Sequence, residues 1–223
     1  MEKGWRVFKM VLTKRRLIWL IPAVIWVMFT LWYTDLGGPL TDEEIDEGLA
    51  QMAAQGWDTG NLSRIEPFLR SDTGRHFVMV NSIDLNETPP RLPSFEAGAS
   101  AQQYVDYYME HMYVQLLSRA SHPVFAGLAV GPSLDVEGVE GVEEWNMAGL
   151  IRYRSRRSFL EIIMHPDMRE RHDYKIAAMT KTFAYPVEPS INPGDLRVLA
   201  ALLLALMAAV FDIVLIDRRQ SLD

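Results

Sequence analysis

Two long apolar segments lie near the ends of the chain. The first, LIWLIPAVIWVMFTLWY, occupies residues 17–33 and contains no charged side chain. The second, VLAALLLALMAAVFDIVLI, occupies residues 198–216 and contains a single acid, Asp212. A helix that crosses a bilayer needs about 20 mainly apolar residues. The two segments therefore predict transmembrane helices, with Trp19 near one end of the first, and Trp32 and Tyr33 at the other, as interfacial aromatic anchors.

Both segments leave an alternative open. A cleaved signal peptide is the alternative for residues 17–33, although the segment exceeds the roughly 7–15 apolar residues of a signal peptide and no small-residue cleavage pattern follows. Asp212 lies about one turn from the end of the second segment. It is interpreted either as an intramembrane polar contact with another helix or as an acid that reaches the membrane interface.

The chain between the apolar segments begins with a helical linker, residues 34–73. Thr41 followed by Glu44 forms a capping box, which predicts the start of a helix. Gly56 is expected to end that helix, and a second short helix is expected at about residues 62–70. The linker is expected to pack on the domain that follows.

Residues 74–188 alternate between strand and helix patterns. RHFVMVNSIDL, HPVFAGLAVG, WNMAGLIRYRS and KTFAYPV predict strands. AQQYVDYYMEHMYVQLLSRA predicts an amphipathic helix, with Ser100 as its N-cap and Gln103 at the third position. RRSFLEIIMHPDMRERHDYKIAAM predicts a helix that is interrupted before Pro166, and Pro186 is expected to help end the last strand. The order β-α-β-β-α-β predicts an α+β, ferredoxin-like domain: a four-stranded antiparallel sheet with helices on one face.

The stretch YRSRRSFLEIIMHPDM carries a resemblance to a known family. It reads as a strand that ends at a serine, then a helix, then a short break of a residue, a proline and an acid. Together with FVMVNSIDL, the tyrosine-rich helix and HPVFAGLAVG, it resembles the dimeric α/β-barrel superfamily, and most of all its small proteins of unknown function. The resemblance covers residues 74–188. It implies no particular reaction, because that superfamily includes monooxygenases, isomerases, haem-handling enzymes and proteins without known chemistry.

Charge is segregated along the chain. Residues 1–16 carry six basic side chains and one acid, and DRR follows the second apolar segment at the start of the tail, residues 217–223. Residues 34–195 carry 25 acids and 13 bases, a net charge of −12, which makes this region a poor partner for nucleic acid. The positive-inside rule then predicts both termini in the cytoplasm, and in a bacterium an inner-membrane protein with a periplasmic central domain. A short tether, residues 189–197, is expected to hold that domain close to the bilayer.

Four arginines in AGLIRYRSRRSFLEII are the main candidates for binding an anion or an acidic partner. Arg152 and Arg154 alternate along a strand, so they share one face. Arg156 and Arg157 begin a helix after the expected N-cap Ser155, where positive charge opposes the helix dipole. The alternative is internal pairing with the excess acids, for example Glu143, Glu144 or Asp173.

Other chemistry is sparse in the sequence. Tyr104, Tyr108 and His111 are candidates for a pocket between the first domain helix and the sheet, and packing of that helix on the sheet is the alternative. There is no cysteine, and the five histidines form no HExxH or HxH pattern, so we expect neither a metal nor a cofactor. No GxSxG, P-loop or GxGxxG motif is present, and no catalytic residue is predicted.

Anchoring at both ends and the lack of a catalytic motif favour a non-catalytic accessory subunit. Its partners would be the lipid bilayer and other subunits of a larger inner-membrane complex, of a respiratory or photosynthetic type. The first alternative is a membrane-anchored enzyme or binder of an apolar small molecule, with a pocket between the sheet and the first domain helix. The second is a homodimer through the sheet face, with a structural role.

Overall fold

The computed structural model describes residues 2–220, with side chains for residues 14–215. The chain forms two compact units, one made of Thr34–Ser190 and the other of the two terminal segments, Met1–Tyr33 and Ile191–Asp223.

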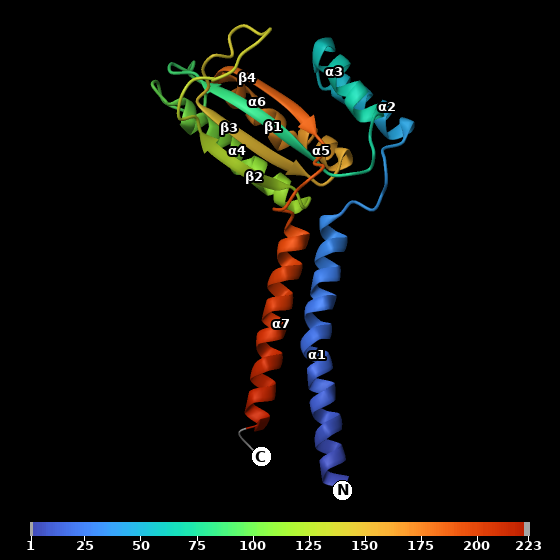
Figure 1. Cartoon of the computed structure of the whole chain (residues 1–223). Helices are drawn as coiled ribbons and strands as arrows, with labels where there is room; N and C mark the ends of the chain where they lie inside the picture. Colours follow the sequence, from blue (N-terminus) through green and yellow to red (C-terminus); the bar gives the residue numbers. More distant parts are fainter. Residues whose placement is uncertain (1, 221–223) are drawn as a thin grey trace. The chain divides into compact units, whose positions relative to one another are not determined.

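The terminal unit consists of two long helices, α1 (Glu2–Tyr33) and α7 (Leu196–Gln220), which pack along each other (Figure 1). Both contain a stretch long and apolar enough to cross a membrane, Lys14–Tyr33 in α1 and Leu196–Leu215 in α7. Only 6% and 11% of these stretches is buried, whereas a core helix of a soluble protein is mostly buried. Helix α1 begins well before the first apolar segment, so Pro22 lies inside the helix and not in its first turns.

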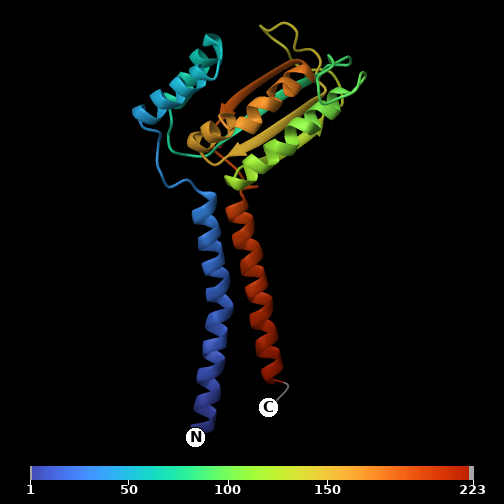
Figure 2. The same cartoon turned by 180° about the vertical axis from the view of Figure 1, so that it is seen from behind.

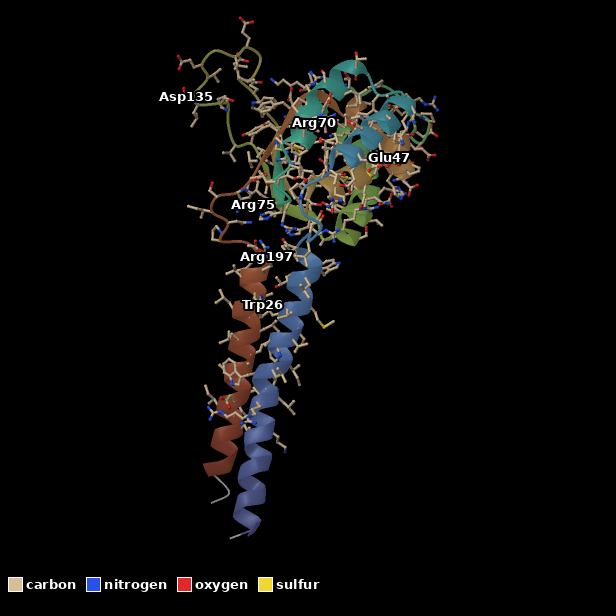
Figure 3. All side chains as sticks on the ribbon, turned by 90° about the vertical axis from the view of Figure 1, so that its right-hand side faces the viewer. Trp26, Glu47, Arg70, Arg75, Asp135 and Arg197 are labelled. Atoms are coloured by element: carbon tan, nitrogen blue, oxygen red, sulfur yellow. The ribbon has the colours of Figure 1, made fainter. Side chains whose placement is uncertain are left out.

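The indole of Trp26 links the two terminal helices. Its Nε1 donates a hydrogen bond of 2.8 Å to the backbone carbonyl of Arg197 at the start of α7 (Figure 3). The hydrogen bond satisfies the only donor of the Trp26 side chain, and the rest of its ring is apolar. Such a side chain suits an interface between two mainly apolar helices.

The central unit contains a four-stranded antiparallel sheet in the order β2-β3-β1-β4. The strands are β1 (Phe77–Leu85), β2 (His122–Leu128), β3 (Met147–Tyr153) and β4 (Met179–Val187). The helices α4 (Ala101–Ser118), α5 (Arg156–Ile163) and α6 (Pro166–Ala177) follow β1 and β3, and α4 and α6 cover one face of the sheet (Figures 1 and 2). This order and strand sequence are those of a ferredoxin-like fold, so the predicted α+β class is confirmed.

The two prolines in the sheet lie on its edge strands. Pro123 is in β2 and Pro186 is in β4, and each of these strands has only one neighbour. A proline has no backbone donor, so an edge strand accommodates it where a central strand would lose a hydrogen bond. The predicted strand KTFAYPV includes Pro186, and β4 accordingly runs through this proline and ends at the next residue, Val187.

Local sequence signals fix the helix starts of this unit. Helix α2 (Asp42–Ala54) has the complete capping box predicted at Thr41 and Glu44, and α4 has one at Ser100 and Gln103. Helix α3 (Thr59–Arg70) begins earlier than expected, because Asp58 caps it by accepting a hydrogen bond from the Asn61 amide.

The core of the central unit contains three clusters, one around Tyr104 and Tyr174 and two that include residues of α5. Of these two, the cluster on the sheet holds Phe77, Met112 and Tyr153, with the rings of Phe77 and Tyr153 stacked at 5.1 Å. In the other, the α2–α3 hairpin packs on α5 through Leu40, Ile45, Met52, Leu69 and Leu160. Residues of the predicted linker thus form part of the central unit.

Candidate functional site

The four arginines of the β3–α5 junction are occupied by partners within the chain. Arg152 is buried and donates from Nη1 to the carbonyl of Ala120 at 2.8 Å. Arg154 donates from Nε to Ser158 Oγ at 3.2 Å. These two contacts bind the end of β3 to the turn before β2 and to the first turn of α5.

Arg156 lies in an ion cluster with the buried side chain of Asp72 and the partly exposed Glu188. Its Nη2 is 3.1 Å from Glu188 Oε1, and its Nε is 3.4 Å from Asp72 Oδ1. It also donates to the carbonyl of Phe68 and to Ser71 Oγ, and its guanidinium lies over the Phe68 ring. All four of these residues belong to the segments before β1 and after β4, which Arg156 connects to α5.

Arg157 makes the corresponding contact to helix α2. It donates to both carboxylate oxygens of Glu44, at 2.9 and 3.1 Å, and lies 3.6 Å from Asp35. The hydrogen bond from Arg157 is the main reason that the pKa of Glu44 falls to about 2. Internal pairing therefore describes Arg156 and Arg157, but their partners are acids of the linker and of the end of β4, and not the three acids named from the sequence.

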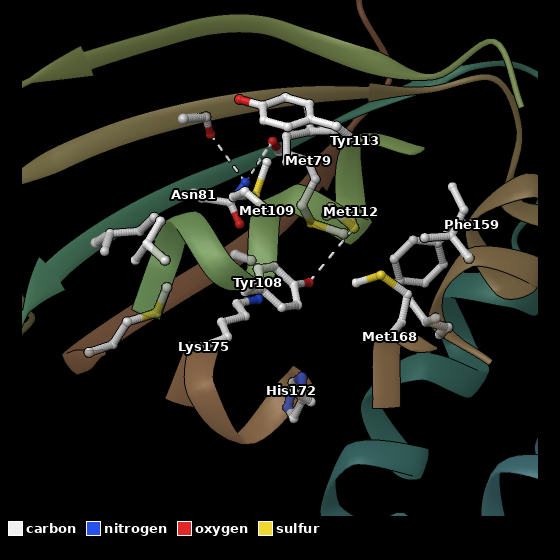
Figure 4. Close-up of a pocket in the computed structure, with 18 of the residues that line it drawn as sticks. Met79, Asn81, Tyr108, Met109, Met112, Tyr113, Phe159, Met168, His172 and Lys175 are labelled. Atoms are coloured by element: carbon white, nitrogen blue, oxygen red, sulfur yellow. Dashed lines mark hydrogen bonds between the residues drawn. The ribbon is translucent and has the colours of Figure 1, made fainter. Parts of the chain in front are cut away.

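A cavity of about 1070 Å³ lies between the helix-facing side of the sheet and the helices (Figure 4). Its origin is one row of the sheet, in which Ala126, Gly149, Asn81 and Ala184 are direct neighbours on successive strands. Three of these four residues have the smallest side chains, so the sheet leaves space where larger residues would fill the interface with the helices. A Cβ built on Gly149 would meet no atom within 4 Å.

The walls of the cavity are rich in methionine. Six of the 12 methionines of the chain line it: Met79, Met109, Met112, Met147, Met168 and Met179. Ile83, Ile151 and Phe159 add further apolar surface. Methionine side chains are flexible and polarizable, so such a wall adapts to apolar ligands of different shapes.

Charged side chains and a histidine also line this space: Asp58, Asp106, Glu110, Arg169, His172, Asp173 and Lys175. Lys175 extends from α6 toward the ring of Tyr108 on α4, and its Nζ lies 5.7 Å from the ring centroid (Figure 4). Burial lowers the pKa of Lys175, and it raises the pKa of Tyr108 to about 12. The pKa of His172 is also lowered, first by partial burial and then by the charge of Lys175.

Asn81 supplies the polar group on the floor of the cavity. Its amide nitrogen donates to the carbonyls of Met79 and Gly149, both at 3.1 Å. These bonds fix the orientation of the amide and leave its oxygen as an acceptor on the side away from the two carbonyls (Figure 4).

Of the three pocket candidates from the sequence, only Tyr108 lines the cavity. Tyr104 is buried one helical turn away, where its hydroxyl donates to the carbonyl of Pro90 and accepts from the Leu92 amide. His111 is also absent from the lining. Lys175 and His172 were missed, although Met168, His172 and Lys175 recur at the i, i+4, i+7 spacing of one helix face.

Among the residues that the structure describes, no group of three or more histidines, cysteines or acids is arranged to hold a metal ion. The most notable ionic contact outside the central unit is in the terminal helices. Asp212 on α7 lies 2.9 Å from Arg15 Nε, and it accepts a hydrogen bond of 3.3 Å from the indole of Trp19 on α1. Asp212 is nearly buried between these partners.

Comparison with known proteins identifies solved structures that are similar to part of the chain, but it assigns the chain to no family. No family model matches the chain, and no curated protein matches it. A protein of unknown function from Rhodopseudomonas palustris has a TM-score of 0.48 and 19% identity, over 59% of this chain and 94% of its own. A dimeric ferredoxin-like protein of unknown function from a Jannaschia species has a TM-score of 0.34 and 10% identity, over 51% and 99%.

A second dimeric ferredoxin-like protein of unknown function, from Thermobifida fusca, has a TM-score of 0.32 and 12% identity, over 51% of this chain and 91% of its own. The assignment of the ferredoxin-like fold to this chain rests on its own strand order and pairing. Membership of the dimeric α/β-barrel superfamily stays a prediction, and the function has to be argued from the residues of the site.

Proposed function

We propose that the central unit binds an apolar small molecule in the methionine-lined cavity, next to a membrane in which α1 and α7 anchor the chain. The observation that carries this proposal is the cavity itself, about 1070 Å³ between the sheet and the helices. Ligand pockets of proteins typically have volumes of roughly 300–1,000 Å³ and mainly apolar walls with a few polar groups. A cavity of this size and lining is suited to a ligand of two or more rings or an equivalent aliphatic chain.

Location at a membrane supports the same proposal. Few residues of the two apolar stretches are buried in the unit that they form, and lipid would cover the exposed ones. The stretch in α7 is far from the N-terminus, so a signal peptide does not account for it. An apolar ligand partitions into the bilayer, and a binding domain anchored there would meet it at a high local concentration. With the basic N-terminal residues inside, the central unit lies on the outer side of the cytoplasmic membrane.

The binding proposal is tested by filling the cavity from the sheet side. In Gly149→Leu the added side chain enters the open space above β3, and binding of a neutral probe, naphthalene-1-acetamide, is expected to be lost. Ala148→Leu is the matched control, because Ala148 is the preceding residue of β3 and faces the opposite side of the sheet. Full-length protein in phosphatidylcholine nanodiscs is titrated by calorimetry, with empty nanodiscs as the blank.

Saturable binding by the wild type and Ala148→Leu, with loss in Gly149→Leu, supports the cavity as the site. Equal binding by all three proteins would place the probe elsewhere and contradict the proposal. The proposal would also be contradicted if titration of the probe into nanodiscs with wild-type protein released no more heat than titration into empty nanodiscs. Thermal unfolding of each variant confirms that the fold is retained.

A second candidate function is that of an accessory subunit in a larger membrane complex. The observation that favours it is the open face of the sheet, where Phe125, Phe183 and Tyr185 are 54%, 45% and 47% exposed. Phe125 and Tyr185 lie in one row with Leu150 and Val80, so the exposed apolar surface is continuous across the strands.

Purification in a mild detergent, followed by chemical cross-linking and mass spectrometry, tests this candidate. A different protein recovered in fixed stoichiometry supports the accessory role. A dimer of this chain supports the alternative of sheet-to-sheet pairing between two copies, and a monomer contradicts both.

A further inference from the structure

We propose that the ligand of the cavity is an anion, of the class of apolar carboxylates, and that Lys175 binds its charged head group. This inference rests on the proposed binding function and specifies the chemistry of the ligand. Lys175 lines the cavity from α6, and its side chain passes into the space between α4 and α6 (Figure 4).

Lys175, which is partly buried, differs from Arg156 and Arg171 in having no acidic partner among the described residues. Arg156 is paired with Asp72 and Glu188, and on α6 itself Arg171 is paired with Glu110 at 3.0 Å. Across the described part of the chain, no hydrogen bond or ion pair is formed by Lys175 Nζ, whose nearest interaction is with the Tyr108 ring. An ammonium group has three hydrogen-bond donors. The face of an aromatic ring replaces only a small part of the solvation that this group receives from water.

The charged groups around Lys175 do not compensate its charge. On α4, Glu110 is engaged by Arg171, and Asp106 accepts a hydrogen bond of 2.7 Å from Gln102. On α6, His172 and Arg169 add donors to the lining, and Asp173, which also lines the cavity, is exposed. The remaining acid of the lining, Asp58, caps helix α3. The sheet contributes the neutral Asn81. A carboxylate in the cavity would therefore be the natural partner of Lys175, because a charge removed from water needs an opposite charge or several hydrogen bonds.

Asn81, the polar group that the sheet contributes to the cavity, favours one orientation of such a ligand. The free oxygen of Asn81 is an acceptor and repels a carboxylate, whereas it accommodates a hydrogen-bond donor on the ligand body. The methionine side chains and Phe159 would then surround the apolar part. An anionic head at α6 and an apolar body over β1 and β3 define the class of ligand.

The test compares two probes that differ in charge and little in shape, naphthalene-1-acetate and naphthalene-1-acetamide. Both are titrated into full-length protein in phosphatidylcholine nanodiscs at pH 7, with empty nanodiscs as the blank. Wild-type protein is expected to bind the carboxylate at least ~10-fold more tightly than the amide, as for a charge-assisted hydrogen bond. In Lys175→Met this ratio is expected to fall to about one, with the affinity for the amide within about twofold of that of the wild type.

Two further variants distinguish a specific role from a general one. Lys175→Arg retains the charge and is expected to retain the preference for the carboxylate. Lys181→Met removes a base outside the cavity, whose Nζ donates to the carbonyl of Gly141, and is expected to change neither affinity. Retention of the preference in Lys175→Met, or its loss in Lys181→Met, would overturn the assignment of Lys175.

The outcomes also separate this inference from the function on which it rests. If the wild type binds the amide at a site that Gly149→Leu blocks, but shows no preference for the carboxylate, only the anion inference fails. If neither probe binds more than to empty nanodiscs, both fail. Should Lys175→Met prove unfolded, the ratio in the wild type and its persistence in Lys175→Arg still decide the question.

Discussion

Replacement of Arg156 by methionine removes the centre of the ion cluster that fastens the α2–α3 hairpin and the end of β4 to α5. The change keeps an unbranched side chain of similar length against Phe68, and so tests charge and hydrogen bonding more than packing. It eliminates the contacts to Asp72 and Glu188 and the donated bonds to Phe68 and Ser71.

The loss of unfolding free energy in Arg156→Met depends on how far Asp72 and Glu188 can be solvated without their counter-ion. The Asp72 side chain is only 2% exposed, so it remains buried without its counter-ion, whereas Glu188 is 27% exposed and returns to water. Breaking a buried ion pair costs about 3–5 kcal/mol. Asp72 still accepts from the backbone amides of Leu40 and Gly74, at 2.9 and 3.0 Å. We therefore expect a loss near the lower end, about 3 kcal/mol, or ~6–12 °C in the unfolding temperature.

The assay is thermal unfolding of the full chain in nanodiscs, followed by near-ultraviolet circular dichroism, with hydrogen exchange to locate the change. Amides of α2 and α3 are expected to lose protection before those of the sheet. Arg91→Met is the control, because Arg91 pairs with Glu96 only at 3.9 Å and both are exposed, so that its cost stays within ~0.5 kcal/mol. In the double variant Arg156→Met/Asp72→Asn the stranded charge is gone, and about 1–2 kcal/mol of the loss should be recovered.

Two results would refute this account of the cluster. One is a cost of Arg156→Met that does not exceed that of Arg91→Met. The other is additivity: the double variant is less stable than Arg156→Met by the same unfolding free energy that Asp72→Asn costs in the wild type. Additive costs mean that the two side chains do not interact.

Three further predictions follow from individual contacts. Ser100→Ala should cost about 1 kcal/mol of unfolding free energy through loss of the α4 cap, and Ser100→Gly only a few tenths, measured by denaturant titration. Glu44→Gln should destabilise the protein at pH 7, with a difference from the wild type that shrinks as the pH falls from about 4.5 to 2: the folded pKa is depressed, so the stabilising ionised form is lost in that range. Asp212→Leu should increase hydrogen exchange along α7 in nanodiscs by removing its contacts to Arg15 and Trp19, while Phe211→Leu, at an exposed neighbouring position, should not. Equal exchange in the two variants would mean that Asp212 does not hold the helices together.

Features that depend on neighbouring residues could be predicted from the sequence. The capping boxes at Thr41 and Ser100, the break at Pro166 and the order of strands and helices are all encoded within a few residues. The end of the last strand just after Pro186 was also predicted correctly, whereas its place at the edge of the sheet, which is what allows a proline within it, is a property of the assembled sheet.

The candidate site shows the same division more sharply. Tyr104 and Tyr108 are one turn apart on α4 and are indistinguishable by spacing, yet only Tyr108 reaches the cavity. The loop after β1 covers Tyr104 and takes its hydroxyl. Lys175 belongs to a helix rich in charged residues, and nothing in its composition marks one lysine as lining an apolar space.

The sequence by itself determined the apolar end segments, the acidic middle and the ferredoxin-like order of elements, because each depends on local composition and period. Only the tertiary structure decided which charges meet and where space remains. Arg156 finds its partners in segments distant along the chain, and the cavity exists because Ala126, Gly149 and Ala184 align in one row of the sheet. Strand register brings small residues together across three strands, and no pattern along a single strand contains that information.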